Sequence, residues 1–197
     1  MRKSIIFILA AFLIAAGPKV STKKSAPAKE IWPLKTGNVW IYKTTIFDDK
    51  EKVTLERYDT LTVLNDILVG SELFYKVQTV ESKDNYTYME FMINREDGFY
   101  SHGENKDKAR YLSYFKYPCS VGDTIKIASD KMLLDSDNAA VKTPAGNFKC
   151  YKYNISYPST QGRNIFYLTP GKGMISFESY KKNKLAFKRE LIELKLK

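Results

Sequence analysis

The sequence predicts an all-β protein, an antiparallel β-sandwich or partly open β-barrel of about ten strands. Apolar and polar residues alternate along many short stretches, and turn residues recur about every 8–12 positions. No stretch has the periodicity of a long amphipathic helix. The chain also carries 14 Tyr, 11 Phe and 2 Trp, residues that suit the half-buried surface of a sheet.

In the first half of the domain, strands alternate with polar turns. In the first strand Trp40, Tyr42 and Thr44 share one face. The second strand ends at Asn65-Asp66 or at Gly70. A hydrophilic loop is expected at 101–108. The expected strands cover residues 39–46, 53–64, 73–80, 86–93, 99–100, 111–115 and 125–127.

The second half is organised around a hairpin at residues 141–150, with the turn Pro144-Ala145-Gly146. Proline presets its own φ and glycine allows a positive φ, so this turn can fix the strand register. A short apolar run at 132–134 and a turn at 135–138 precede it. The remaining strands are expected at 150–157, 164–168, 174–180 and 185–195; the last of these would also place Phe187, Leu191 and Leu194 on one side of a helix, but a strand is favoured.

The chain divides into three parts. Residues 1–17 read as a signal peptide, because Arg2 and Lys3 precede an apolar run from Ile5 to Ala16. That run is shorter than the roughly 20 residues that span a bilayer, although an uncleaved anchor is the alternative. Residues 18–30 are rich in Lys, Pro and Ser and predict a flexible linker. Residues 31–197 form a single β domain of ordinary size.

The net charge of +10 is concentrated at the two ends of the chain. Residues 1–30 contribute +5, and residues 181–197, with seven Lys or Arg and two Glu, contribute another +5. A nucleic-acid binder should carry a basic face with reading elements, and no such module is present, so no nucleic-acid partner is expected. The basic C-terminal segment predicts a solvated edge strand protected by lysines; contact with an anionic surface is the alternative.

Cys119 and Cys150 are the two cysteines, and both lie in the part expected to be exported. An oxidising compartment allows a disulfide between them, which would close a loop of about 30 residues and stabilise the fold by ~3–4 kcal/mol. Two buried thiols are the alternative.

No catalytic, metal or cofactor site is expected. The lone histidine, His102, is predicted in a solvated loop, and no Gly-x-Ser-x-Gly elbow accompanies it. The stretch 135–138 lacks the Gly and Glu of a calcium loop. Glu90 and Glu178 are singled out as carboxylates inside strands, and neither is assigned a role.

Four motifs follow one another along the domain: Trp40-Ile41-Tyr42, Tyr117 to Asp123, Pro144 to Cys150, and Tyr167 to Gly173. In this order the chain resembles a family of exported β-domain proteins of bacterial envelopes, many of them lipoprotein-like. The resemblance implies a β-rich fold and no known activity, so it assigns no functional residue. The sequence departs from the lipoprotein-like members because no cysteine follows its apolar N-terminal run.

Together these observations favour an exported, periplasmic or extracellular domain of the cell envelope. Its expected role is non-enzymatic binding of a partner, either a small apolar or carbohydrate ligand or an envelope protein. A Tyr-lined cavity would fit this role. A carbohydrate-active or other hydrolase that uses loop or strand carboxylates is one alternative. A basic-tailed protein that binds anionic surfaces is the other.

Overall fold

The computed structural model describes residues 30–83, 85–103, 111–127, 130–157 and 160–197. The expected signal peptide and all of the expected linker except Glu30 lie outside these residues. The described part contains twelve strands and no α-helix: β1 (Val39–Phe47), β2 (Val53–Val69), β3 (Glu72–Glu81), β4 (Tyr86–Arg95), β5 (Gly98–Gly103), β6 (Tyr111–Lys116), β7 (Thr124–Ile127), β8 (Asp130–Thr143), β9 (Gly146–Tyr157), β10 (Gly162–Thr169), β11 (Gly173–Lys181) and β12 (Lys184–Lys195).

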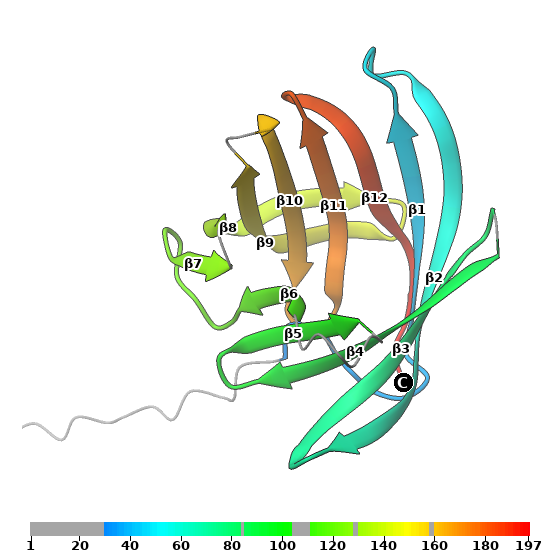
Figure 1. Cartoon of the computed structure of the whole chain (residues 1–197), viewed down its shortest axis with the longest axis vertical. Helices are drawn as coiled ribbons and strands as arrows, with labels where there is room; N and C mark the ends of the chain where they lie inside the picture. Colours follow the sequence, from blue (N-terminus) through cyan, green and yellow to red (C-terminus); the bar gives the residue numbers. More distant parts are fainter. Residues whose placement is uncertain (1–29, 84, 104–110, 128–129, 158–159) are drawn as a thin grey trace, which may run out of the picture.

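All twelve strands belong to one antiparallel sheet that curls into a partly open barrel (Figure 1). The first strand, β1, lies in the middle of this sheet, because it pairs with β2 on one side and with β12 on the other. From β1 the strands run in order to β6 at one edge, and from β12 they run back in order to β7 at the other. The all-β prediction is therefore confirmed as a partly open barrel, with two strands more than expected.

The gap between the edges β6 and β7 is closed by side chains. Tyr153 on β9 donates a hydrogen bond to the carbonyl of Lys116 on β6 over 2.8 Å. The ring of Phe115 meets the Tyr153 ring edge-on at 5.4 Å. The segment between the edge strands adds a backbone bond from Leu134 to the carbonyl of Asp123. This seam, residues 115–123 against β8 and β9, joins the two edges without a strand pair.

One end of the barrel is filled by the segment that precedes β1. The backbone carbonyls of Glu30 and Ile31 accept hydrogen bonds from Gly171 and Gly173. Trp32, 5% exposed, packs 5.0 Å from Phe99 and 5.9 Å from Trp40. The segment therefore joins the main apolar core. We call this the closed end.

The predicted Pro-Ala-Gly hairpin is confirmed, and its tip reaches across the sheet. β8 and β9 pair with Thr143 opposite Gly146. Gly146 has a φ of +132°, a conformation that glycine adopts without strain. The amide of Ala145 donates to the carbonyl of Leu191 on β12 over 3.3 Å. The hairpin therefore helps to cover the closed end, behind β10 and β11 in Figure 1.

Some predicted boundaries are confirmed and others were wrong. β2 continues through Asn65-Asp66 to Val69 and the chain turns at Gly70, which has a φ of +62°, so the second of the two predicted strand ends is confirmed. The expected turn at 135–138 is part of β8, which absorbs its polar residues in two register shifts opposite β9. The expected loop at 101–108 is wrong for residues 101–103, which belong to β5, and residues 104–108 lie outside the described residues. The last element, β12, is the favoured strand and not the alternative helix.

Candidate functional site

Charged residues gather on the inner face of the barrel, towards the end opposite the closed end. In β1 the inner positions run Trp40, Tyr42, Thr44. Tyr42 pairs with Asp59 on β2, and Thr44 pairs with both Arg57 on β2 and Arg189 on β12. Paired residues of an antiparallel sheet share a face. The inner surface is therefore apolar at Trp40 and becomes charged beside Tyr42, where Asp59 lies, and beside Thr44, where the two arginines lie.

Asp59 is the centre of this group, and its side chain is fully buried. Its Oδ1 accepts from Arg57 Nε at 3.0 Å. Its Oδ2 accepts from Thr44 Oγ1 at 2.6 Å and from Arg189 Nη2 at 2.7 Å. Arg57 also donates from Nη2 to Glu81 Oε1 at 2.7 Å. We call Thr44, Arg57, Asp59, Glu81 and Arg189 the charged network.

The network is buried but not sealed. The side chains of Arg57, Glu81 and Arg189 retain exposures of 15%, 14% and 16%. Moving a carboxylate out of water costs several kcal/mol unless charges and hydrogen bonds compensate it. Asp59 receives that compensation from two guanidinium groups and one hydroxyl. Both arginine side chains nevertheless keep a small part of their surface in contact with solvent.

Glu90 on β4 faces the same space, and its carboxylate has no hydrogen bond to any residue that the structure describes. It pairs with Val77, a fully buried core residue, and so lies on the inner face. Burial raises the pKa of Glu90, and the positive charge of Arg189 partly opposes that rise. Thr79, two residues from Val77 on β3, is 1% exposed, and its Oγ1 has no hydrogen-bond partner among the described residues. The inner face thus holds a carboxylate that a ligand could satisfy, whereas the Thr79 hydroxyl is buried away from solvent.

An aromatic wall continues this face across β10, β11 and β12. Phe177 pairs with Arg189 and also with Phe166. The Phe166 and Phe177 rings lie 4.6 Å apart, and Phe177 and Phe187 lie 5.6 Å apart. All three are only partly buried. The guanidinium carbon of Arg189 lies 5.6 Å from the Phe187 ring centre. We call Phe166, Phe177 and Phe187 the aromatic wall; together with the charged network, Glu90 and Thr79 it forms the polar inner face.

Chemically, the polar inner face suits binding better than acid–base chemistry. Both oxygens of Asp59 are engaged by permanently charged or hydroxyl donors. Glu81 is tied to Arg57. Of the inner carboxylates named here, Glu90 alone is available to a ligand. The aromatic wall offers an apolar surface on the same inner face as Glu90. The site therefore fits a ligand with an apolar face and a hydrogen-bond donor.

The two cysteines are free thiols in the structure, so it contains no Cys119–Cys150 disulfide. Cys119 Sγ lies 3.4 Å from Tyr153 Oη, at the seam. Cys150, fully buried, lies 3.3 Å from Thr169 Oγ1. Burial raises the pKa of both thiols. Each sulfur therefore lies beside a hydroxyl group and not beside the other sulfur. The structure agrees with the alternative of two thiols and not with the disulfide.

The other residues singled out from the sequence do not converge. His102 is on β5 and not in a loop; its ring meets Phe74 edge-on at 5.7 Å, and burial lowers its pKa. Glu178 lies next to Phe177, hence on the opposite face of the sheet, and accepts from Tyr180 Oη at 2.9 Å. Asp135 pairs with Lys152 at 3.1 Å. The described residues include no group of His, Cys, Asp and Glu that could hold a metal ion.

The basic residues of 181–197 do not form one patch. Lys181, Lys182 and Lys184 lie at the β11–β12 turn, while Lys195 and Lys197 lie at the other end of β12. Between them Lys188 pairs with Glu190 at 2.8 Å, and Arg189 points inward to Asp59. The predicted edge strand was wrong, because β12 lies between β1 and β11 in the middle of the sheet. The anionic-surface alternative was based on this basic C-terminal segment, and the strand separates its charges.

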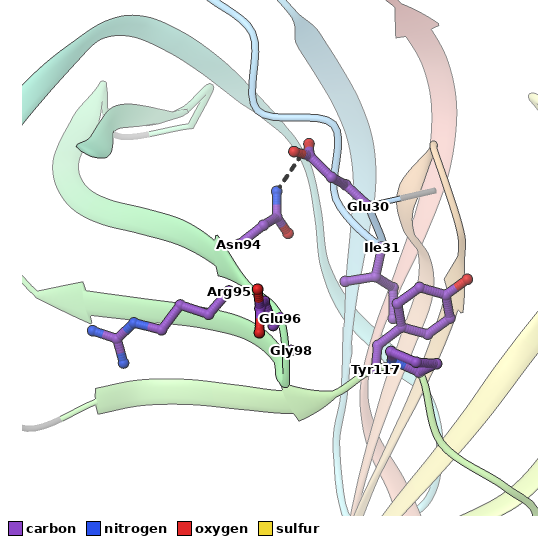
Figure 2. Close-up of a pocket in the computed structure, with 8 residues that line it drawn as sticks. Glu30, Ile31, Asn94, Arg95, Glu96, Gly98 and Tyr117 are labelled. Carbon is purple, nitrogen blue, oxygen red and sulfur yellow. Dashed lines mark hydrogen bonds between the residues drawn. The ribbon is translucent and has the colours of Figure 1, made fainter. Parts of the chain in front are cut away.

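A shallow hollow lies outside the barrel beside the closed end (Figure 2). Its volume is about 240 Å³, and it is lined by Glu30, Ile31, Asn94, Arg95, Glu96, Gly98, Tyr117 and Pro118. Asn94 Nδ2 donates to Glu30 and to the carbonyl of Trp32. Arg95 extends away from Tyr117 and binds Glu72 through two hydrogen bonds. Because these polar groups are already engaged within the protein, the hollow is a weaker ligand site than the polar inner face.

The motifs behind the family resemblance lie at the closed end and the seam. Trp40 Nε1 donates to the carbonyl of Lys172 at 2.6 Å, and Tyr42 Oη donates to that of Met174 at 2.9 Å. The first and last motifs therefore meet at β1 and β11. Tyr117 packs edge-on against Tyr151 at 5.3 Å. These residues hold the barrel together, and among them Tyr42 also borders the polar inner face, because its ring centre lies 5.8 Å from the guanidinium carbon of Arg189.

Comparison with known proteins identifies the fold. No family model matches the chain, and no curated protein matches it. A crystal structure of a candidate exported protein with a YmcC-like fold from Bacteroides fragilis matches with a TM-score of 0.57 and 16% identity, over 86% of this chain and all of the other. A candidate lipoprotein from Parabacteroides distasonis has a TM-score of 0.48 and 18% identity, over the same shares. The first likeness shows a shared YmcC-like fold.

Within the described residues no helix is long and apolar enough to cross a membrane.

Proposed function

We propose that this chain is an exported protein of the bacterial cell envelope that binds a small ligand at its polar inner face. Export is supported by the charged and apolar start of the sequence. It is also supported by the fold, which is shared with a candidate exported protein. Binding is supported above all by one observation: Asp59 is fully buried between two arginines whose side chains remain partly exposed to solvent.

The ligand we propose is small, with an apolar face and at least one hydrogen-bond donor. The aromatic wall would receive the apolar face, since partly exposed phenylalanine rings lose unfavourable contact with water when covered. Glu90 would accept the hydrogen bond from the ligand's donor. Small apolar and carbohydrate ligands that carry a hydroxyl or amine both meet this description.

The hydrolase alternative has less support. A glycosidase needs two carboxyl groups, one that donates a proton and one that acts as nucleophile or base. Asp59 is held by three hydrogen bonds, which leaves it little freedom to react. Glu90 could fill one of these two roles, and Asp59 is not free to fill the other.

A thermal-shift screen of the protein against envelope-type metabolites tests the proposal. A ligand that binds only the native state raises Tm as its concentration rises above Kd. We expect hits that raise the Tm of the wild type and of Glu178→Gln, and that lose their effect on Glu90→Gln. Glu178 is the matched control because it is a strand carboxylate on the other face. Hits that shift all three proteins equally would place the site elsewhere.

A further inference from the structure

The turn between β2 and β3 carries an exposed apolar tip. Leu68 is 71% exposed, Val69 is 54% exposed and Leu73 is 44% exposed. Gly70 and Ser71 form the turn between them. We call residues 67–73 the hairpin tip. Large apolar side chains that remain exposed next to one another often mark an interaction site.

The tip is apolar on both of its faces. Ile67 pairs with Phe74, and both belong to a small apolar cluster on the outer face of β3 to β5. Leu68 pairs with Leu73, one position along, so these two side chains lie on the opposite face. A flat partner would cover one face and leave the other in water. An apolar medium that surrounds the tip would remove the side chains on both faces from water.

Charge does not oppose entry of the tip into such a medium. Glu72 is the one charged residue within 67–73. Arg95 binds its two carboxylate oxygens at 2.7 and 2.8 Å. This bidentate pair neutralises the carboxylate and satisfies its hydrogen bonds. The tip therefore presents apolar side chains and one compensated charge.

The tip lies beside the point where the chain enters the domain. Asn94 binds the Glu30 carboxylate at 3.2 Å, and its neighbour Arg95 binds Glu72 in the tip. Residues 18–29, which precede Glu30, can span at most about 40 Å. Before them lies the apolar run 5–16. A domain still joined to that run would therefore stay close to the membrane, with the tip on the side where the tether attaches.

The size of the tip argues against a second copy of the chain as its partner. A stable protein interface buries about 800 Å² on each side, and three partly exposed aliphatic side chains supply much less. From these observations we propose that the hairpin tip inserts into the surface of a lipid bilayer of uncharged phospholipid. This contact would hold the polar inner face at a fixed orientation to the membrane.

Flotation with vesicles tests the proposal. Residues 18–197 would be mixed with vesicles of phosphatidylcholine and phosphatidylethanolamine, and the double variant with Leu68→Ser and Val69→Ser would be compared with the wild type. We expect the partition coefficient of the double variant to fall about tenfold or more, because each buried aliphatic side chain contributes a factor of that order. The matched control combines Val53→Ser with Tyr58→Ser, residues 54% and 53% exposed elsewhere on β2, and should float like the wild type.

Three results would overturn the proposal. The wild type does not float, the tip variant floats as well as the wild type, or flotation requires anionic lipid and disappears in high salt. The last result would assign the contact to lysines. If circular dichroism shows that the double variant is unfolded, Leu73→Ser alone gives the same comparison.

Discussion

At the closed end of the barrel, Trp32, Trp40 and Phe99 pack ring against ring, and indole and phenol groups donate to backbone carbonyls. Two residues farther along the same strands, Asp59 lies between Arg57 and Arg189. The two regions share β1, β2 and β12, so backbone geometry does not distinguish them. The chemistry of their side chains distinguishes them. The packed aromatic rings need no ligand, whereas a charged face that is only partly covered can bind a ligand in place of solvent.

The largest expected effect comes from breaking the charged network at its centre. Asp59→Ala leaves Arg57 and Arg189 facing each other without their shared carboxylate. Removing one partner of a buried ion pair costs about 3–5 kcal/mol, and urea unfolding would measure this loss. The control is Glu56→Ala on the same strand, whose pair with Lys43 is exposed and should contribute less than about 1 kcal/mol. Equal losses in both variants would contradict the account of the network.

A glycine at the closed end tests the aromatic packing next. Gly173 has a φ of +81°, and a Cβ there would lie 2.9 Å from the Trp32 ring. We expect Gly173→Ala to lower the free energy of unfolding by about 2–4 kcal/mol, through backbone strain and overpacking together. Gly70→Ala shares the positive φ but meets no atom within 4 Å, so it should cost only about 1–2 kcal/mol. The difference between the two variants isolates the contact with Trp32.

The seam, where residues 115–123 meet β8 and β9, gives a smaller effect. Tyr153→Phe removes the hydroxyl that donates to the Lys116 carbonyl and lies near Cys119, while the ring contact with Phe115 is kept. We expect a loss of about 1 kcal/mol in chemical unfolding. No change in stability would mean that the hydroxyl does not help to close the gap between β6 and β9.

The smallest effect concerns Glu90 and depends on pH. Its pKa is raised in the folded protein by burial, so the folded state binds a proton more readily than the unfolded state. Stability therefore falls as the pH rises from the ordinary pKa of glutamate through the raised value. Glu90→Gln cannot ionise, so we expect it to be more stable than the wild type at pH 7 and equal to it at low pH. Unfolding curves across this range would show the stabilities of the two proteins converge as the pH falls, and a variant less stable than the wild type at pH 7 would contradict this prediction.

Much of the closed end could be predicted from the sequence, because its signals are local. Alternation placed Trp40 and Tyr42 on one face, and the Pro144-Ala145-Gly146 turn predicted its hairpin. The extra length of β2 and β8 could not be predicted in this way. Pairing with neighbouring strands outweighed the turn preference of Asn65-Asp66 and of residues 135–138.

The polar inner face could not be predicted, because it depends on pairing between strands far apart in the sequence. Asp59 and Arg189 are 130 residues apart, and no motif links them. One signal was present: both occupy positions that continue an apolar face, Asp59 before Leu61 and Arg189 between Phe187 and Leu191. A charge at such a position marks either an error in the assumed alternation or a buried site. The sequence showed that Glu90 is a carboxylate inside a strand, but it could not show that Arg189 lies near Glu90.

One nuclear magnetic resonance titration tests the central claim most directly. A ¹⁵N-correlation spectrum contains the Nε–H signals of Arg57 and Arg189 at the polar inner face and the indole N–H signals of Trp32 and Trp40 at the closed end. Addition of the best hit from the thermal-shift screen should move the arginine signals and leave both indole signals in place. Movement of the indole signals with unchanged arginine signals would contradict binding at the polar inner face.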